Sequence, residues 1–248
     1  MQFGSEADGP VEGVTYTWPQ GDEVEKLPFT SFDFWGYLAA GFLLLCAVDS
    51  AWSFGLLARK DWTLVEGILA VSVAYVIGHV VAGVSSLLLE RGLVGRVLGW
   101  PSATLFGASK APAWLQKLMG FYYGKLPEET QKAVLDKAAQ AGVSAPGEAL
   151  FWLVFAKARG SDRTWSRLSD FLNQYSFCRN VAMVSLVDSV ILLWAHWQPT
   201  GTLQQLLWAR IALFVGVALL LRYLKFLRHY SLELFTSFAH AEEKPTTP

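Results

Sequence analysis

The chain contains little charge. Only 17% of its 248 residues are charged, and the formal net charge is -1, whereas about 25% of residues are charged in a typical soluble domain. Hydrophobic residues make up 53% of the chain, and the charges are missing in long blocks, which is typical of a protein solvated by lipid. This composition excludes an intrinsically disordered chain, and the near-neutral total argues against a nucleic-acid-binding protein.

Cysteines and the common catalytic motifs are also scarce. Cys46 and Cys178 lie within or beside apolar segments, so we expect small buried hydrophobic residues rather than a disulfide or zinc ligands. The sequence has no Gly-rich nucleotide-binding loop, no Gly-x-Ser-x-Gly elbow, no paired metal-binding cysteines and no kinase signature. We therefore expect no cofactor and no metal, and the sequence assigns no catalytic residue.

Four long apolar runs predict membrane spans. They cover residues 34–57, 62–89, 181–197 and 203–221, and a helix rising about 1.5 Å per residue crosses roughly 30 Å of hydrocarbon in about 20 residues. Aromatic residues at the ends of these runs, such as Trp62 and Trp197, favour membrane spans over buried soluble helices. The sequence predicts an all-α polytopic membrane protein with four transmembrane helices and a helical cytoplasmic subdomain between helices 2 and 3.

Basic residues predict the orientation, because Lys and Arg near the ends of spans are retained in the cytoplasm. The interval 90–180 is rich in Lys and Arg, and three more basic residues follow span four directly, whereas the turn 198–205 has none. The first 33 residues are acidic and have no basic stretch, so we expect no cleavable signal peptide. Both termini and the central interval are predicted to be cytoplasmic.

The chain divides into five segments on this basis. We expect an acidic cytoplasmic N-terminal segment (1–33), a transmembrane hairpin (34–89), a cytoplasmic helical subdomain with an interfacial elbow (90–180), a second transmembrane hairpin (181–221), and a cytoplasmic helix extension and tail (222–248). Within the subdomain, Pro127 and Pro146 predict helix starts, and Gly142 and Gly160 predict helix ends. No helix breaker occurs over 164–197, which predicts one continuous helix from the cytoplasm through span three.

Three charged residues occur at similar depth inside the predicted spans. Counted at about 1.5 Å per residue, Asp49, Asp188 and Arg210 lie roughly 12, 13 and 10 Å from the outer ends of spans one, three and four. A charge at mid-bilayer costs roughly 2.5 to 3.5 kcal/mol on insertion scales, so each is expected to find protein, water or a partner. The cluster is either an ion pair that fixes the register of the bundle or part of an ion or proton path.

A second polar group is predicted in the inner half. Tyr75 and His79 share a face of span two, and Glu90 and His229 are expected near the same membrane surface. Together they could form a polar site, although a single histidine in a span is more often a hydrogen-bonded packing residue. No pair of ligands in this group has the spacing of a zinc metalloprotease.

Two further sets of residues have a structural interpretation. Small residues at four-residue intervals in span two predict a surface for close helix packing, within one chain or between chains: Ala74, Gly78, Ala82 and Ser86. Basic residues at the inner boundary are predicted to face lipid headgroups, where anchoring is favoured over recognition of a particular lipid: Arg179, Arg222, Lys225 and Arg228.

The strings Asn173–Asn180, Arg222–Phe226 and Arg228–Tyr230 resemble those of uncharacterised bacterial inner-membrane proteins with four spans. This resemblance implies a bacterial inner membrane and no particular activity. We expect a homo-oligomer in the lipid bilayer with a channel, membrane-effector or signalling role. Its helical cytoplasmic region would be the sensor, or a surface for a cytoplasmic protein or small-molecule partner. The alternative is a membrane-embedded enzyme acting on a lipid or another amphiphile, using His79 or His229 with Glu90.

Overall fold

A computed structural model describes residues 31–240 apart from 57–58, 110 and 144. Regular structure in this part of the chain is entirely helical. Four helical stretches are long and apolar enough to cross a membrane: Phe34–Trp52, Leu64–Thr104, Thr164–His196 and Leu203–His240. The predicted all-α fold with four helices long and apolar enough to span a membrane is therefore confirmed for the described residues, while most of the acidic segment 1–33 lies outside them.

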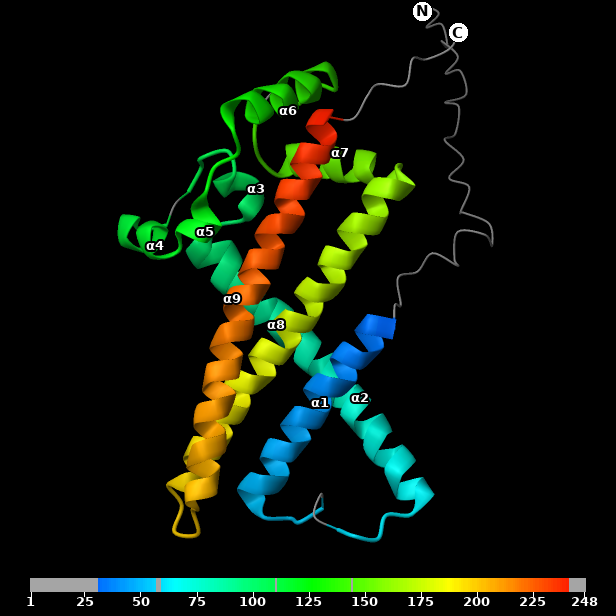
Figure 1. Ribbon diagram of the computed structural model, residues 1–248, viewed down its shortest axis with the longest axis vertical. Helices are drawn as coiled ribbons and strands as arrows, with labels where there is room; N and C mark the ends of the chain where they lie inside the picture. The colour runs from blue at the N-terminus through cyan, green and yellow to red at the C-terminus, as the bar shows by residue number, and fades with distance from the viewer. Residues whose placement is uncertain (1–30, 57–58, 110, 144, 241–248) are drawn as a thin grey trace, which may run out of the picture.

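The spanning helices form two hairpins. Helices α1 (Ser31–Trp52) and α2 (Leu64–Ser85) cross each other, and α2 continues directly into the π-helix η2 (Ser86–Leu98). Helices α8 (Asp162–His196) and α9 (Leu203–His240) form a long antiparallel pair. The connection between α1 and α2 and the connection between α8 and α9 lie at the same end of the molecule (Figure 1).

Shorter helices gather at the opposite end of the bundle (Figure 1). They are α3 (Pro101–Thr104), α4 (Ala113–Leu118), α5 (Gly120–Tyr123), α6 (Glu128–Gln140) and α7 (Glu148–Arg159). Residues from α6 and α7 share a buried apolar core with the ends of α8 and α9, including Val134, Leu150, Leu168, Leu234 and Phe235. The Lys137 ammonium of α6 donates to the carbonyl oxygens of Phe238 and Ala239, at 3.2 and 2.7 Å, and so satisfies acceptors in the last turn of α9.

Two helix ends differ from the predicted spans. Helix α1 ends at Trp52, before the end of the apolar run, because Ser53 and Gly55 adopt positive φ angles of 53° and 66°. The second helix runs past the predicted boundary at Leu89 to Leu98, and Gly99 stops it with a φ of 83°. By contrast, α8 runs without interruption, as the absence of helix breakers predicts.

The segment after η2 is held by tyrosine hydroxyls. Tyr122 donates to the carbonyl oxygen of Gly99 at 2.8 Å, and Tyr123 donates to that of Leu98 at 3.0 Å. The Tyr122 ring is fully buried, and this burial raises the pKa of its hydroxyl well above the ordinary value. The hydroxyl therefore remains a neutral donor at physiological pH and keeps the turn fixed to the end of the π-helix.

Helices α1 and α2 touch through their backbones. A Cβ atom built on Gly78 would lie 1.9 Å from the carbonyl oxygen of Tyr37, and one built on Gly41 would lie 1.7 Å from that of Ala74. No side chain fits at either position, so the two glycines allow this crossing. Glycine pairs of this kind are typical of membrane helices, which associate through close packing rather than through a hydrophobic effect.

Candidate functional site

The three helices α1, α8 and α9 enclose a cavity of about 380 Å³. Helices α1 and α9 both pack on α8, which supplies the floor of the cavity, and half-exposed side chains of α1 and α9 form its rim. Apolar residues dominate the lining, together with one carboxylate, two serines and a cysteine: Leu43, Cys46, Ala47, Ser50, Ser185, Asp188, Leu192, Trp208, Ile211, Ala212 and Val215. The cavity therefore lies within the spanning part of the bundle, nearer to the hairpin turns.

Asp188 is the charged group in this cavity. Its side chain is buried, with 6% of the residue exposed, and Oδ1 has no hydrogen-bond partner among the described residues. Buried polar atoms in proteins are nearly always paired, and an unpaired carboxylate in a membrane is costly. Within the described residues, Asp188 therefore has no protein partner that compensates for the burial of this oxygen atom.

The other two members of the predicted charge cluster lie in different surroundings. The Asp49 carboxylate accepts a hydrogen bond from the Leu56 backbone amide, at 2.9 Å, in the turn after α1. Cys46, one helical turn before Asp49, lines the cavity beside Asp188. Arg210 is exposed on α9, and no ion pair joins it to either aspartate within the described residues. The structure thus places Asp188 in the cavity, Asp49 beside the turn after α1, and the Arg210 guanidinium on the exposed side of α9.

Gln205 fixes the end of the bundle next to the cavity. Its side-chain oxygen accepts a hydrogen bond from the Thr202 backbone amide at 2.9 Å. The Thr202 hydroxyl in turn accepts from the Gln205 backbone amide at 3.2 Å, and the two bonds form a reciprocal helix cap. The Gln205 side-chain nitrogen also donates to the carbonyl oxygen of Ser50 at 2.9 Å. One side chain therefore caps α9 and attaches it to α1.

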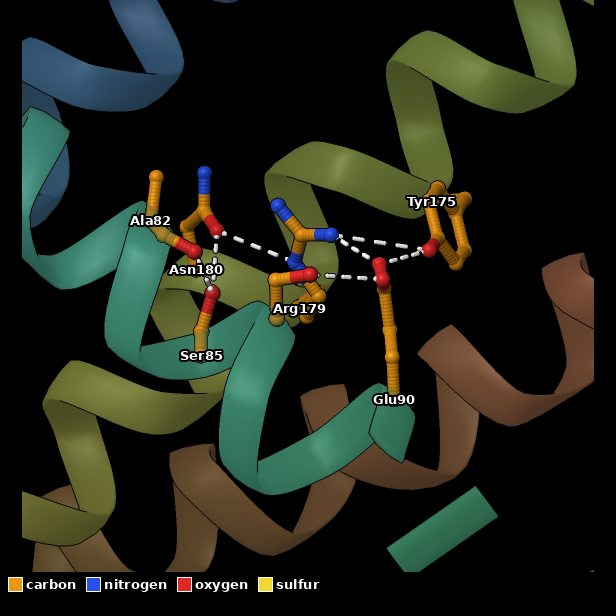
Figure 2. A network of polar contacts seen from close by, with 7 residues as sticks. Ala82, Ser85, Glu90, Tyr175, Arg179 and Asn180 are labelled. Atoms are coloured by element: carbon orange, nitrogen blue, oxygen red, sulfur yellow. Dashed lines mark hydrogen bonds and ion pairs between the residues drawn. The ribbon is translucent and has the colours of Figure 1, made fainter. Parts of the chain in front are cut away.

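A second polar cluster connects η2 to α8. The Glu90 carboxylate forms an ion pair with Arg179 and accepts a hydrogen bond from the Tyr175 hydroxyl. Figure 2 shows Glu90 reaching from η2 to both α8 side chains. The Arg179 guanidinium also lies over the Tyr175 ring, 5.5 Å from its centroid. This ion pair is largely buried, so both charges depend on each other for stabilisation.

Hydroxyl and amide groups extend this cluster. The Ser85 hydroxyl and the Arg179 Nε both donate to Asn180 Oδ1, at 2.7 and 3.2 Å (Figure 2). The Ser86 hydroxyl donates to Glu90 at 2.7 Å. Polar groups of α2, η2 and α8 thus form one connected network at a point where the surrounding side chains are apolar.

The predicted inner polar site is divided between separate contacts. The His79 ring lies 4.2 Å from the Tyr37 ring and 4.6 Å from the Tyr75 ring, measured between centroids. The His229 Nδ1 atom lies 2.7 Å from the Lys225 carbonyl oxygen, and Glu90 belongs to the network with Arg179. Within the part of the chain that the structure describes, no group of His, Cys, Asp and Glu residues is arranged to hold a metal ion.

Three of the four residues in the predicted small-residue stripe of span two are packed against other helices. Ala74, Gly78 and Ala82 are buried, and Gly78 lies against the backbone of α1, whereas Ser86 bonds to Glu90. Each of these contacts is within one chain.

The four basic residues also differ from one another. Arg179 is buried in its ion pair rather than placed toward headgroups, and Arg228 donates to the Gly124 carbonyl oxygen at 3.1 Å. Arg222 and Lys225 are exposed, and the Arg222 guanidinium lies over the Phe226 ring. Two of the four are thus available to a membrane surface, and the other two stabilise the fold.

Sequence reasoning identified Asp188 and Glu90 but missed their surroundings. Polar residues lie on several sides of α8, where the other helices pack around it, namely Tyr175, Arg179, Asn180, Ser185 and Asp188. Polar residues recurring through an otherwise apolar run were the signal available in the sequence.

No family model, curated protein or solved structure matches the chain. The function therefore has to be inferred from the two polar groups on α8 and the cavity beside one of them.

Proposed function

We propose that the protein is an oligomeric bacterial inner-membrane protein with a channel role, and that it conducts protons along the buried polar residues of α8. The observation that carries this proposal is the unpartnered Asp188 carboxylate in a cavity among three spanning helices. A carboxylate that can bind and release a proton inside the membrane is the usual element of a proton relay.

The polar groups along α8 supply the rest of the path. At about 1.5 Å per residue, Asp188 lies roughly 4.5 Å along the helix from Ser185, and Ser185 lies roughly 7.5 Å from Asn180. Beyond Asn180, the hydrogen bonds of Ser85, Arg179, Glu90 and Tyr175 are continuous. Between Ser185 and Asn180 the helix is packed by the buried residues Ala182 and Val184, so in this proposal water enters between the helices at this level to complete the path. Asp49 lies nearer the hairpin turn, where its carboxylate accepts from the Leu56 amide.

The helical region 90–180 is assigned the role of sensor. In this proposal it lies in the cytoplasm with both chain termini, where its basic residues favour it. Its core includes residues of α8 and α9, and both helices continue without a break to the cavity. A protein or small molecule that shifts α6 or α7 would therefore move the helices that line the path.

The enzyme alternative has less support. Catalysis at the inner surface would need Glu90 as a free acid or base, yet its carboxylate is held by Arg179 and Tyr175. His79 and His229 lie in other contacts. The arrangement holds Glu90 in the ion pair, and within the described residues neither histidine bonds to it.

Proton flux in liposomes tests the proposal. Purified protein is reconstituted with an internal pH dye, and a potassium diffusion potential drives proton entry. We expect wild-type protein to acidify the lumen and Asp188→Asn to lower the rate to that of empty liposomes. Asp61→Asn is the matched control, because Asp61 is exposed in the turn between α1 and α2, and it should conduct like wild type. A folded Asp188→Asn variant with wild-type flux would overturn the proposal, as would an inactive wild type.

A further inference from the structure

We infer that Arg210 of one copy enters the Asp188 cavity of a second copy, so that the site is completed at a subunit interface. This inference rests on the proposed function in treating the cavity as the functional site, and it adds the partner. The two charges are complementary, and each lacks an ion-pair partner within the described residues of its own chain.

Arg210 points away from the cavity of its own chain. At about 100° per residue, it lies roughly 160° around α9 from Trp208 and from Ala212, and both of these residues line the cavity. The same helix therefore presents its cavity wall to one side and its guanidinium to the other. Within the described residues the Arg210 of the same chain forms no ion pair with Asp188, whereas an adjacent copy can supply the guanidinium.

The surface around Arg210 is suited to contact with protein. Residues on the same side of α9, at intervals of three and four, are apolar and exposed: Leu207, Phe214, Val217 and Leu221. Phe214 alone is 76% exposed. A guanidinium on a lipid-facing helix surface is energetically unfavourable. In a membrane it is stabilised only by a charged or polar partner, by water or by the headgroup region.

Depth in the membrane also matches. Asp188 lies eight residues before the end of α8, and Arg210 lies seven residues after the start of α9, which corresponds to roughly 12 and 10.5 Å from the same hairpin turn. Two copies standing side by side with the same orientation therefore bring the two groups to one level.

The geometry of this contact sets the kind of assembly. The cavity and Arg210 lie on different sides of one protomer, so the contact is head-to-tail, and its repetition closes a ring where the rotation between copies allows it. In such a ring every Asp188 receives a guanidinium from its neighbour at the subunit interface. The cavity of about 380 Å³ has room for an arginine side chain together with water.

Crosslinking between differently tagged copies tests the inference. One copy carries Asp188→Cys and the other Arg210→Cys, both in a background with Cys46→Ala and Cys178→Ala. A bis-methanethiosulfonate reagent as long as an arginine side chain is added to membranes. We expect a crosslinked species that carries both tags. Val190→Cys replaces Asp188→Cys in the control, because Val190 is two residues further along α8 and 68% exposed, and it should give no product with Arg210→Cys.

Oligomeric mass in nanodiscs gives an independent readout. Arg210→Gln should shift the protein toward the monomer, and Arg210→Lys should keep the oligomer because it retains the charge. The absence of a mixed crosslink in folded protein, or an unchanged mass for Arg210→Gln, overturns the inference. These outcomes are separate from those of the proposed function: loss of flux in Asp188→Asn without a crosslink overturns only the interface, and a crosslink in a protein without flux overturns only the proton path.

Discussion

The crossing of α1 and α2 allows a sharp test of the packing, because one added methyl group is enough. In Gly78→Ala the new Cβ would lie 1.9 Å from the Tyr37 carbonyl oxygen, whereas real Cβ atoms essentially never come within 3.0 Å of another heavy atom. The two backbones must therefore separate by at least about 1 Å, and the change is felt because helix interfaces are closely packed. Gly83→Ala on the same helix is the matched control, since its Cβ would meet nothing within 4 Å.

The expected magnitude follows from two opposing effects. Replacing glycine by alanine within a helix stabilises it by up to about 1 kcal/mol, and this gain is shared by both variants. Overpacking a close contact costs about 1–3 kcal/mol, and this cost applies to Gly78→Ala alone. The free energy of unfolding should therefore be about 1–3 kcal/mol lower for Gly78→Ala than for Gly83→Ala.

Unfolding in mixed detergent micelles measures this difference. Increasing mole fractions of sodium dodecyl sulfate are added to each variant in a mild detergent, and helix loss is followed by circular dichroism. Gly41→Ala should behave like Gly78→Ala, because its Cβ would lie 1.7 Å from the Ala74 carbonyl oxygen. Equal stability of Gly78→Ala and Gly83→Ala would show that the two helices do not touch at this point, and the crossing would be wrong.

Three other predictions concern orientation and the two polar anchors. In a cysteine-free background, an impermeant maleimide added to intact cells should label Thr200→Cys and leave Lys132→Cys unlabelled; the reverse pattern would invert the topology. Thr200 is chosen over Gly201 because a Cβ on Gly201 would lie 1.9 Å from the His196 carbonyl oxygen. Arg179→Leu leaves Glu90 buried without its cation and should lower the free energy of unfolding by about 3 kcal/mol. The double variant Arg179→Leu/Glu90→Met should recover part of this loss, because no buried charge remains. Thermal unfolding of the two variants checks this, and equal losses in both would contradict the pairing. Lys137→Met removes both hydrogen bonds to the end of α9 and should increase hydrogen exchange in α6 with little change in α2; unchanged exchange in α6 would show that this docking contact is unimportant.

The sequence by itself determined the class of protein and most of the helices. Long apolar runs have one stable form in lipid, because every backbone amide and carbonyl must be paired within its own segment. The spans over α8 and α9 were also predicted as continuous with their extensions, since no proline or glycine interrupts the relevant stretch of α8. The ends were less certain, because positive φ at Ser53 and the π-helical turn after Ser85 depend on local packing rather than on hydropathy.

Only the tertiary structure decided which polar groups meet. Asp49, Asp188 and Arg210 share a depth, and depth can be counted along a sequence, but the direction of each side chain depends on how each helix is rotated in the bundle. That rotation is set by packing contacts such as Gly216 against Leu186 and Gln205 against Ser50. Consequently Asp188 faces a cavity while Arg210 faces outward. Likewise, the sequence predicts that Arg179 faces lipid headgroups. In the structure it is a buried ion-pair partner, because the π-helix brings Glu90 alongside α8.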